Sequence, residues 1–332
     1  MEILLTGSVA FDYLMTFPGY FKDHFLPDRL DKISLSFLAD SMVRMRGGIA
    51  PNIAYTLAIL GNKPHLWATV GEDFEEYRQW LESNGVDTSG ARVITGEFTA
   101  SFFVNTDKAN AQIASFYPGA MGYASNHSLH ELAGNPPDLV VISPNDPVAM
   151  IQYVEECQAL EIPYIYDPSQ QIVRLDEAAL KAGIIGALAW FGNDYEAGLV
   201  EKMTGYKPAD FPFLPGKDEG AFVVVTRGHE GSTIYSRSGI YSIPVVPPRI
   251  VVDPTGGGDA FRGGFLAGYA HGLDLEICGQ MGALAATYCL EKRGPQSQTY
   301  NLDEFVERFR YHFDDSGKLD ILLKQHAVDG SL

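Results

Sequence analysis

Three consecutive glycines followed by an aspartate, Gly256 to Asp259, form the segment of this sequence that is best suited to chemistry. Glycines let the backbone turn tightly and bring its N–H groups close to a ligand. A helix is predicted to begin at about Asp259, and a helix start binds anions such as phosphate. A carboxylate there could take the proton of an attacking hydroxyl group. It could also be an ordinary helix N-cap.

Two common nucleotide-binding motifs are missing from the sequence. No Gly-x-x-x-x-Gly-Lys-Ser/Thr loop occurs, and Lys217 is followed by Asp218. The glycine at Gly7 lacks the second and third glycines of a dinucleotide fingerprint. The glycines at 256–258 therefore belong to neither of these two site classes.

A second glycine pair, Gly47 and Gly48, precedes a predicted helix in the first third of the chain. The apolar stripe Ile53, Leu57 and Leu60 gives that helix one buried face. Asn52 either caps the helix or exchanges hydrogen bonds with a polyol.

Short apolar runs that alternate with helical patterns must position these motifs. Candidate strands are Ile3–Leu5, His65–Val70, Leu139–Ser143, Tyr164–Tyr166, Ala189–Phe191 and Phe222–Thr226, and candidate helices are Asn52–Leu60, Phe74–Asn84, Pro147–Leu160, Glu177–Ala182, Ala260–His271 and Leu275–Leu290. Strands that are apolar throughout are typical of a largely parallel sheet covered by helices on both sides. No repeat or low-complexity linker divides the chain, so we expect one domain over residues 1–332.

Two segments, roughly 11–46 and 96–117, break the alternation of strands and helices. Their composition and local alternation favour extended or hairpin structure inserted into the α/β frame. We expect a small β-element over one end of the sheet, with two irregular surface loops as the alternative.

The net charge of −18 makes nucleic acid and anionic membranes improbable partners, because both repel an acidic surface. The three cysteines, Cys157, Cys278 and Cys289, are widely spaced, which indicates reduced thiols. The N-terminus predicts a strand, and no apolar run is long enough to span a membrane. We therefore expect a cytoplasmic enzyme.

The two glycine motifs together resemble the two signatures of the ribokinase-like (PfkB) kinases. Gly47–Ala54 matches Gly-Gly-x-x-x-Asn-x-Ala, and Asp253–Asp259 matches Asp-x-Thr-Gly-x-Gly-Asp, with Pro254 and Gly257 as conservative departures. The resemblance covers nearly the whole chain. It implies a three-layer α/β/α ribokinase-like domain with a small β-lid, and phosphoryl transfer from Mg-ATP to a primary alcohol. In that reading Asp259 is the base, and Gly256, Gly257 and Gly258 form the anion hole.

Segments 34–38, 111–121 and 167–171 are similar to the bacterial adenosine kinase branch, which implies phosphorylation of the adenosine 5′-hydroxyl to give AMP. The implied sugar pocket contains Ser8, Asp12, Gly48 and Asn52, and the implied base pocket contains Ser36, Phe102, Phe116, Gln170 and Gln171, with Arg174 reaching the phosphates. Simpler interpretations remain open: Asp12 as a turn cap, both phenylalanines as core residues, and Arg174 as a surface residue. A kinase for a sugar or another nucleoside is the alternative function, and a binding protein without catalysis is a third.

The resemblance also implies where ATP and metal ions bind. Asn193 and Glu196 match a segment that tunes magnesium and phosphate binding. In that segment Glu196 would not bind the magnesium ion directly and would act on it through its other ligands. Thr226, Arg227 and Gly228 match the nucleotide-side glycine loop, and Asp253 and Thr255 match a region that holds potassium in many relatives. We also expect a homodimer formed through the β-lid.

Overall fold

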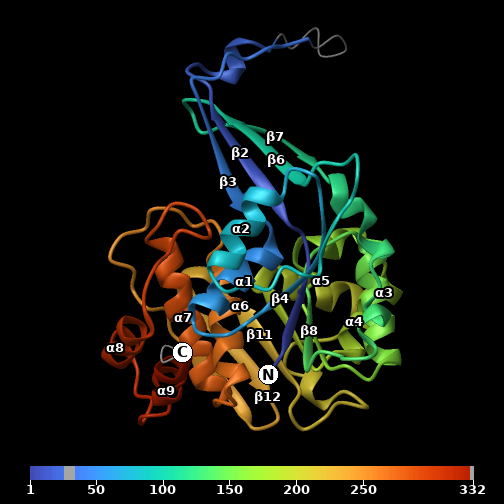
Figure 1. Cartoon of the computed structure of the whole chain (residues 1–332), viewed down its shortest axis with the longest axis vertical. Helices are drawn as coiled ribbons and strands as arrows, with labels where there is room; N and C mark the ends of the chain where they lie inside the picture. The colour runs from blue at the N-terminus through green and yellow to red at the C-terminus, as the bar shows by residue number, and fades with distance from the viewer. Residues whose placement is uncertain (26–33, 330–332) are drawn as a thin grey trace.

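The computed structural model describes residues 1–25 and 34–329, and its centre is a nine-stranded sheet (Figure 1). Its strand order is β13-β12-β11-β10-β9-β8-β1-β4-β5. The strands are β1 (Ile3–Thr6), β4 (His65–Val70), β5 (Ala91–Val93), β8 (Leu139–Ile142), β9 (Tyr164–Tyr166), β10 (Ala189–Asn193), β11 (Phe222–Thr226), β12 (Ser232–Ser236) and β13 (Gly239–Ile243). Neighbours from β11 to β5 pair in parallel, whereas β11, β12 and β13 pair antiparallel.

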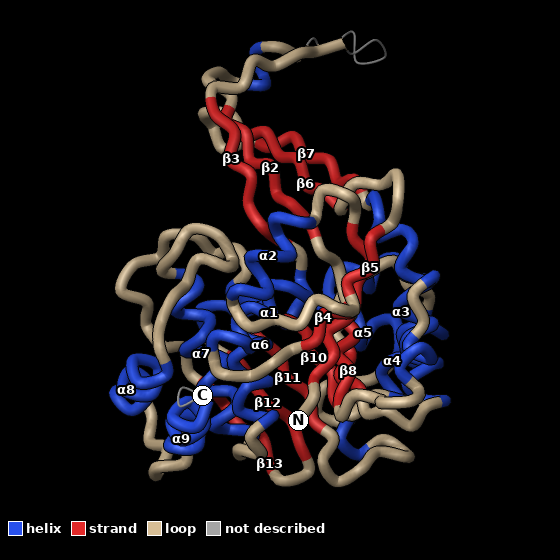
Figure 2. Tube along the Cα trace, in the orientation of Figure 1, coloured by secondary structure: helices blue, strands red, loops and turns tan. Residues whose placement is uncertain are grey.

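Two helical layers cover the sheet, as the apolar strands predict (Figure 2). The helices are α1 (Ile49–Ile59), α2 (Glu75–Ser83), α3 (Pro147–Ala159), α4 (Glu177–Gly186), α5 (Asp194–Thr204), α6 (Gly257–Ala270), α7 (Leu275–Leu290), α8 (Leu302–His312) and α9 (Asp320–Asp329). Alternation along β1 sends Ile3 and Leu5 into the core with α1, α6 and α7, and Leu4 into the core with α3 and α4. The expected three-layer α/β/α arrangement is therefore confirmed.

The segments 11–46 and 96–117 contribute the strands of a second sheet, which projects from one end of the α/β body (Figure 1). This small sheet has the order β3-β2-β6-β7, with β2 (Ala10–Thr16), β3 (Ser41–Gly47), β6 (Ala100–Thr106) and β7 (Gln112–Tyr117). Strand β2 pairs antiparallel with β3 and parallel with β6. The alternative of two irregular loops is wrong for the strands of these segments, while residues 26–33 lie outside the described residues.

Helix α6 lies between α1 and α7, and its glycines allow the close approach. A Cβ atom on Gly263 would lie 2.9 Å from the Ile53 carbonyl oxygen of α1. A Cβ atom on Gly264 would lie 2.7 Å from the Met281 carbonyl oxygen of α7. Packing therefore explains both glycines, as their clustering on one helix suggests.

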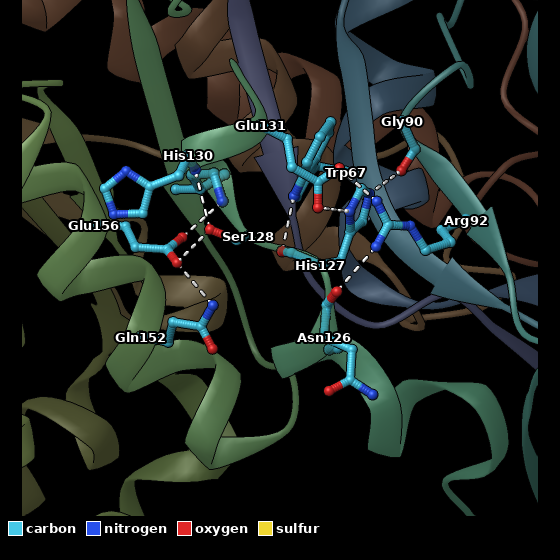
Figure 3. Close-up of polar contacts among 12 residues, drawn as sticks. Trp67, Gly90, Arg92, Asn126, His127, Ser128, His130, Glu131, Gln152 and Glu156 are labelled. Carbon is cyan, nitrogen blue, oxygen red and sulfur yellow. Dashed lines mark hydrogen bonds and ion pairs between the residues drawn. The ribbon is translucent and has the colours of Figure 1, made fainter. Parts of the chain in front are cut away.

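A cluster of polar contacts attaches the segment between β7 and β8 to the α/β body (Figure 3). The helical turns η3 (Gly119–Asn126) and η4 (Leu129–Leu132) follow β7 and lead to β8. Between them, the buried His127 ring stacks on Trp67 with its centroid 3.7 Å away. The Glu156 carboxylate of α3 accepts 2.6 Å hydrogen bonds from the Ser128 hydroxyl and the Leu129 N–H. These contacts anchor one end of the small sheet's connection to β4 and α3.

None of the helices in residues 1–25 and 34–329 is long and apolar enough to cross a membrane. All three cysteines are buried and form no disulfide.

Candidate active site

The first turn of α6 places Asp259 beside a series of backbone N–H groups. Gly256 precedes the helix in the left-handed conformation, with φ of 79°, and the helix begins at Gly257. The predicted start at Asp259 is therefore two residues late, and Asp259 is not the N-cap. Gly256 has to be glycine for a second reason, because a Cβ atom there would lie 2.2 Å from the Pro295 Cβ atom. The N–H groups of a helical first turn lack partners within the helix, so this turn can bind an anion.

Asn52 connects Asp259 to the first turn of α1. Its Nδ2 donates a 2.9 Å hydrogen bond to Asp259 Oδ2, and its Oδ1 accepts a 2.9 Å hydrogen bond from Gln296 Nε2. Gln296 in turn contacts the Tyr77 hydroxyl, which donates to the Gly47 carbonyl oxygen at 2.9 Å. Asn52 lies inside α1, whose N-cap is Gly48, so the capping interpretation of Asn52 is wrong. The chain of bonds fixes the orientation of the Asn52 amide and the Asp259 carboxylate.

Arg262 lies one turn after Asp259 and is buried. It forms an ion pair that the sequence motifs did not suggest. Its guanidinium pairs with the buried Asp167 carboxylate, with Nη2 donating to Oδ1 at 2.8 Å. Its Nη1 donates to the Gly258 carbonyl oxygen at 3.1 Å. The spacing of three between Asp259 and Arg262 could have indicated that both lie on one face of the helix. No local pattern indicated the pairing with Asp167.

Burial governs the charge state of two carboxyl groups in this site. It raises the pKa of Asp259 to about 6, while the positive charge of Arg262 and the hydrogen bond from Asn52 oppose that rise. It likewise raises the pKa of Asp12 to about 6. Both groups therefore change protonation state close to neutral pH.

Asp12, Ser8 and Gly48 meet where the small sheet joins the body. Asp12 lies in β2, and a Cβ atom on Gly47 of the neighbouring strand would lie 2.5 Å from its Oδ2. Asp12 is thus a strand residue and not a turn cap. Gly48 has φ of 93°, and a Cβ atom there would lie 2.5 Å from the Ser8 carbonyl oxygen. The Ser8 hydroxyl accepts a 3.3 Å hydrogen bond from the Ile49 N–H at the start of α1.

Strand register places Phe102 and Phe116 in one row with Asp12. Asp12 on β2 pairs with Phe102 on β6, and Phe102 pairs with Phe116 on β7. Paired residues share a face of a sheet, so both aromatic side chains lie on the same face as the Asp12 carboxylate, one and two strands away from it. Phe116 is 50% exposed, so the core interpretation does not hold for its ring.

The remaining residues predicted for the acceptor site lie in different environments. Gln171 is buried, and its Nε2 donates a 2.7 Å hydrogen bond to the Asn145 carbonyl oxygen. Gln170 and Arg174 are exposed on the helical turn η5 (Ser169–Arg174). Ser36 is exposed in the connection between β2 and β3, beside Phe37, whose ring contacts Phe17 and Phe21. That connection lies at the outer end of the small sheet (Figure 1), so Ser36 is not brought to Asp12 and Asn52.

A largely apolar cavity of about 450 Å³ opens on the other side of the α6 start. Its lining includes Thr226 and Gly228 after β11, Gly257 and Gly258 of α6, and residues of α7. Of the predicted nucleotide-side loop, Arg227 does not line it, because its guanidinium bonds to the Thr233 and Tyr235 hydroxyls. Other lining residues are Val245, Val246, Pro248, Val251, Pro254, Phe261, Ala283, Ala286 and Leu290.

Asn193 and Glu196 form a reciprocal capping box at the start of α5. Asn193 Oδ1 accepts from the Glu196 N–H at 2.8 Å, and Glu196 Oε2 accepts from the Asn193 N–H at 2.8 Å. Burial raises the pKa of Glu196, against hydrogen bonding from Asn193. This arrangement orients Glu196 at the carboxyl end of β10.

The carboxylate of Asp253, in the loop before α6, accepts two backbone hydrogen bonds. Asp253 Oδ1 accepts from the Thr255 N–H at 2.9 Å, and Oδ2 accepts from the Gly294 N–H at 3.0 Å. In the described part of the chain, no group of three or more His, Cys, Asp or Glu side chains could hold a metal ion. A divalent ion would therefore need ligands from a bound phosphate and water.

Comparisons with known proteins agree with this geometry. Residues 8–301 match the pfkB family carbohydrate kinase profile. A nucleoside kinase of Methanothermobacter thermautotrophicus is 31% identical over 93% of this chain and 95% of its own length. The structure of Burkholderia thailandensis nucleoside kinase in complex with inosine is 35% identical, with a TM-score of 0.80 over 94% of this chain and 98% of that one. A cytidine kinase of Thermococcus kodakarensis is 30% identical over 80% of this chain and 95% of its own length.

Proposed function

This chain belongs to the pfkB family of carbohydrate kinases, and from that premise we propose that it transfers the γ-phosphoryl group of ATP to the 5′-hydroxyl of a nucleoside, with adenosine as the preferred acceptor. The observation that carries the proposal is the position of the α6 start. Asp259 lies between the Asp12 and Asn52 side of the site and the apolar cavity that Gly257 and Gly258 line. Two ligands bound on those two sides would meet at this turn.

Asp259 would act on the acceptor as a general base. Its carboxylate takes the proton of the 5′-hydroxyl as the oxygen attacks the γ-phosphorus, and the bond from phosphorus to the bridging oxygen of ADP breaks. Phosphoryl transfer depends on positioning and on stabilising charge. The N–H groups of the α6 first turn would stabilise the charge on the transferring group.

The ATP base and ribose would occupy the apolar cavity of about 450 Å³, with the phosphates directed toward Gly257 and Gly258. Mg²⁺ would be held mainly by those phosphates and water, with Glu196 acting through water. Potassium would bind at Asp253 and the Thr255 carbonyl oxygen. Chelation should abolish turnover, and equal turnover in sodium-only and potassium buffers would remove the potassium site.

The nucleoside class is supported by the aromatic row on the small sheet and by the relatives. Phe102 and Phe116 offer flat apolar walls beside Asp12, which suits a stacked base and a ribose diol. Inosine is the second candidate acceptor, because the similar Burkholderia thailandensis protein is solved in complex with it.

A substrate panel tests the proposal directly. ATP consumption is measured with adenosine, inosine, cytidine, 2′-deoxyadenosine, ribose and fructose as acceptors. Adenosine should give the highest kcat/KM, and 2′-deoxyadenosine should be much poorer because a buried polar group left unpaired costs about 1–3 kcal/mol. A higher kcat/KM for a free sugar would overturn the nucleoside assignment and leave the family assignment intact.

The role of Phe102 and Phe116 in nucleoside binding can be tested separately. Phe102→Ala and Phe116→Ala should each weaken adenosine binding far more than ATP binding, as measured by calorimetry. A matched control is Phe98→Ala, which removes an exposed ring outside the paired row. Equal losses for adenosine and ATP would contradict stacking on this face.

A further inference from the structure

A cavity of about 340 Å³ lies at the β3 edge of the small sheet and adjoins the site described above. It opens between β3, α2 and the loop 293–297. Its lining residues are Phe11, Arg44, Met45, Arg46, Glu76, Arg293, Gly294, Pro295, Gln296 and Ser297. None of Ser8, Asp12, Asn52 and Asp259 is among them.

The alternation of β3 places the two arginines of this cavity on the face of the small sheet that Asp12 does not occupy. Met45 pairs with Asp12, whereas Arg44 pairs with Tyr13 and Arg46 with Phe11. Consecutive residues of a strand point to opposite faces of the sheet. The two arginines therefore lie on the face opposite to Asp12. Met45 lies on the Asp12 face and also lines the cavity, so the cavity opens around the edge strand β3 next to the proposed nucleoside site.

Positive charge is in excess in this cavity, although the whole chain has a net charge of −18. Its lining contains three arginines and one carboxylate, Glu76. The charge of Arg293 also acts on Asp253, whose pKa it helps to lower. Arg46 Nη2 donates to Glu76 Oε1 at 2.6 Å, whereas Arg44 Nη1 is 3.7 Å from Glu76 Oε2, which is too long for a hydrogen bond. Within residues 1–25 and 34–329, the guanidinium groups of Arg44 and Arg293 make no hydrogen bond.

Aromatic rings hold two of these guanidinium groups in place. Arg44 lies over the Phe11 ring, with its central carbon 3.8 Å from the centroid, and Arg46 lies over Trp80 at 4.6 Å. Stacking uses the face of a guanidinium and leaves its N–H edge for another partner. Such edges match the oxygen spacing of a phosphate group.

We propose that this cavity is a second ligand site, which binds a phosphate-bearing anion through Arg44, Arg46 and Arg293. The anion is inorganic phosphate or the phosphate of a nucleoside monophosphate. The volume lies near the lower end of the range for small-molecule pockets, roughly 300–1,000 Å³. Phe11, Met45 and Pro295 supply apolar surface for the remainder of a nucleotide.

An anion bound there would contact two parts of the molecule at once: the small sheet and the loop 293–297. Gln296 lines the cavity and also donates to Asn52 at 2.9 Å. Trp80 Nε1 donates to Gln296 Oε1 at 3.2 Å. Occupancy is thereby linked to the group that orients Asp259, and the affinity for the acceptor should change when the anion is bound.

Trp80 provides a direct readout of binding that needs no catalysis. The intrinsic fluorescence of the full chain is titrated separately with inorganic phosphate and with AMP, at constant ionic strength. Both titrations should saturate, and the tighter of the two identifies the source of the phosphate. Arg44→Gln/Arg293→Gln should bind about tenfold or more weakly, because charge-assisted contacts are lost.

Two further variants keep the test sharp. Lys63→Gln/Lys202→Gln makes the same change in net charge at exposed positions outside the cavity and should bind as the unmodified chain does. Glu76→Gln removes the competing carboxylate and should bind several-fold more tightly. Unaltered affinity in both Arg44→Gln/Arg293→Gln and Glu76→Gln, or the absence of saturation in the unmodified chain, would overturn the proposal.

Discussion

The Asp259 carboxylate lies where desolvation and nearby polar groups have opposite effects. Burial favours its neutral form, while Arg262 and the Asn52 amide favour the charged form, and the resulting pKa is about 6. A base with that pKa is mostly ionised at neutral pH and still basic enough to accept a proton. The pKa of Asp259 should therefore change when Arg262 or Asn52 is replaced.

Asp259→Asn should retain the fold and nucleoside binding but lose turnover by about 100- to 10,000-fold, because an amide cannot take the hydroxyl proton. Steady-state kinetics measure the loss, and calorimetry with adenosine checks that binding remains. Near-normal turnover in this variant would remove Asp259 from the role of base.

The pH dependence of kcat/KM should report the same carboxylate. Because the base must be ionised, activity is expected to fall as pH drops below about 6, the pKa of Asp259. Asp12 has a similar pKa, so the profile reports both groups together. An activity that stays constant down to pH 4.5 would contradict a base of this kind.

Arg262→Gln should move the acid limb of that profile upward by roughly one pH unit, because the nearby positive charge no longer favours the carboxylate. Arg262→Lys retains a positive charge and serves as the control, with a smaller shift expected. A lower kcat with no change in the profile would indicate that Arg262 only supports the local structure.

Close packing of α6 against its two neighbours determines where its first turn lies. The contact with α7 depends on Gly264, and the contact with α1 depends on Gly263. Because Asp259 and the anion-binding N–H groups lie at the end of this helix, the glycine packing also sets the geometry of the site. A helix interior otherwise disfavours glycine by about 1 kcal/mol relative to alanine.

Gly264→Ala should therefore destabilise the protein by about 1–3 kcal/mol, since the added methyl group overlaps the Met281 carbonyl oxygen and the Ala285 side chain. Gly198→Ala on α5 is the matched control, because a Cβ atom there meets nothing within 4 Å. That variant should gain roughly 0.5–1 kcal/mol. Urea unfolding measures both, and equal effects would contradict the packing argument.

At the scale of the molecule, the small sheet exposes apolar side chains that the body does not cover. Leu38 is 87% exposed, Met42 62% and Ile113 40%. Exposed apolar residues near sheet edges favour contact with another chain. We therefore expect two copies to associate through their small sheets.

Light scattering at micromolar concentration should give the mass of a dimer. Ile113→Asp places a charge on the exposed face of the small sheet and should shift the population toward monomer. Tyr311→Asp alters an exposed aromatic residue on α8 and should leave the mass unchanged. A monomeric mass for the unmodified chain would count against association through the small sheet.

Local pattern alone determined much of the α/β body. The strands Ile3–Leu5, His65–Val70 and Tyr164–Tyr166 are found within a residue of their predicted bounds, because short, mainly apolar runs between turn residues favour buried strands. Strands β12 and β13 were not predicted, because mixed polar and apolar residues there give no clean period. Helix α5 was likewise not predicted, because its first residues are polar. Its capping box became evident only in the structure.

The family resemblance of the two glycine motifs implied, without any coordinates, that Gly256 to Asp259 and Asn52 belong to one site. In the structure Asn52 bonds to Asp259, although 207 positions separate them. Which side chains complete that site depends on contacts between distant segments, which no local period encodes. The Arg262–Asp167 pair joins α6 to the end of β9, and Gln296 reaches Asn52 from the loop after α7. Only the tertiary packing that buries these groups sets the pKa of Asp259, and only the register of β3 directs Arg44 and Arg46 to the face opposite Asp12.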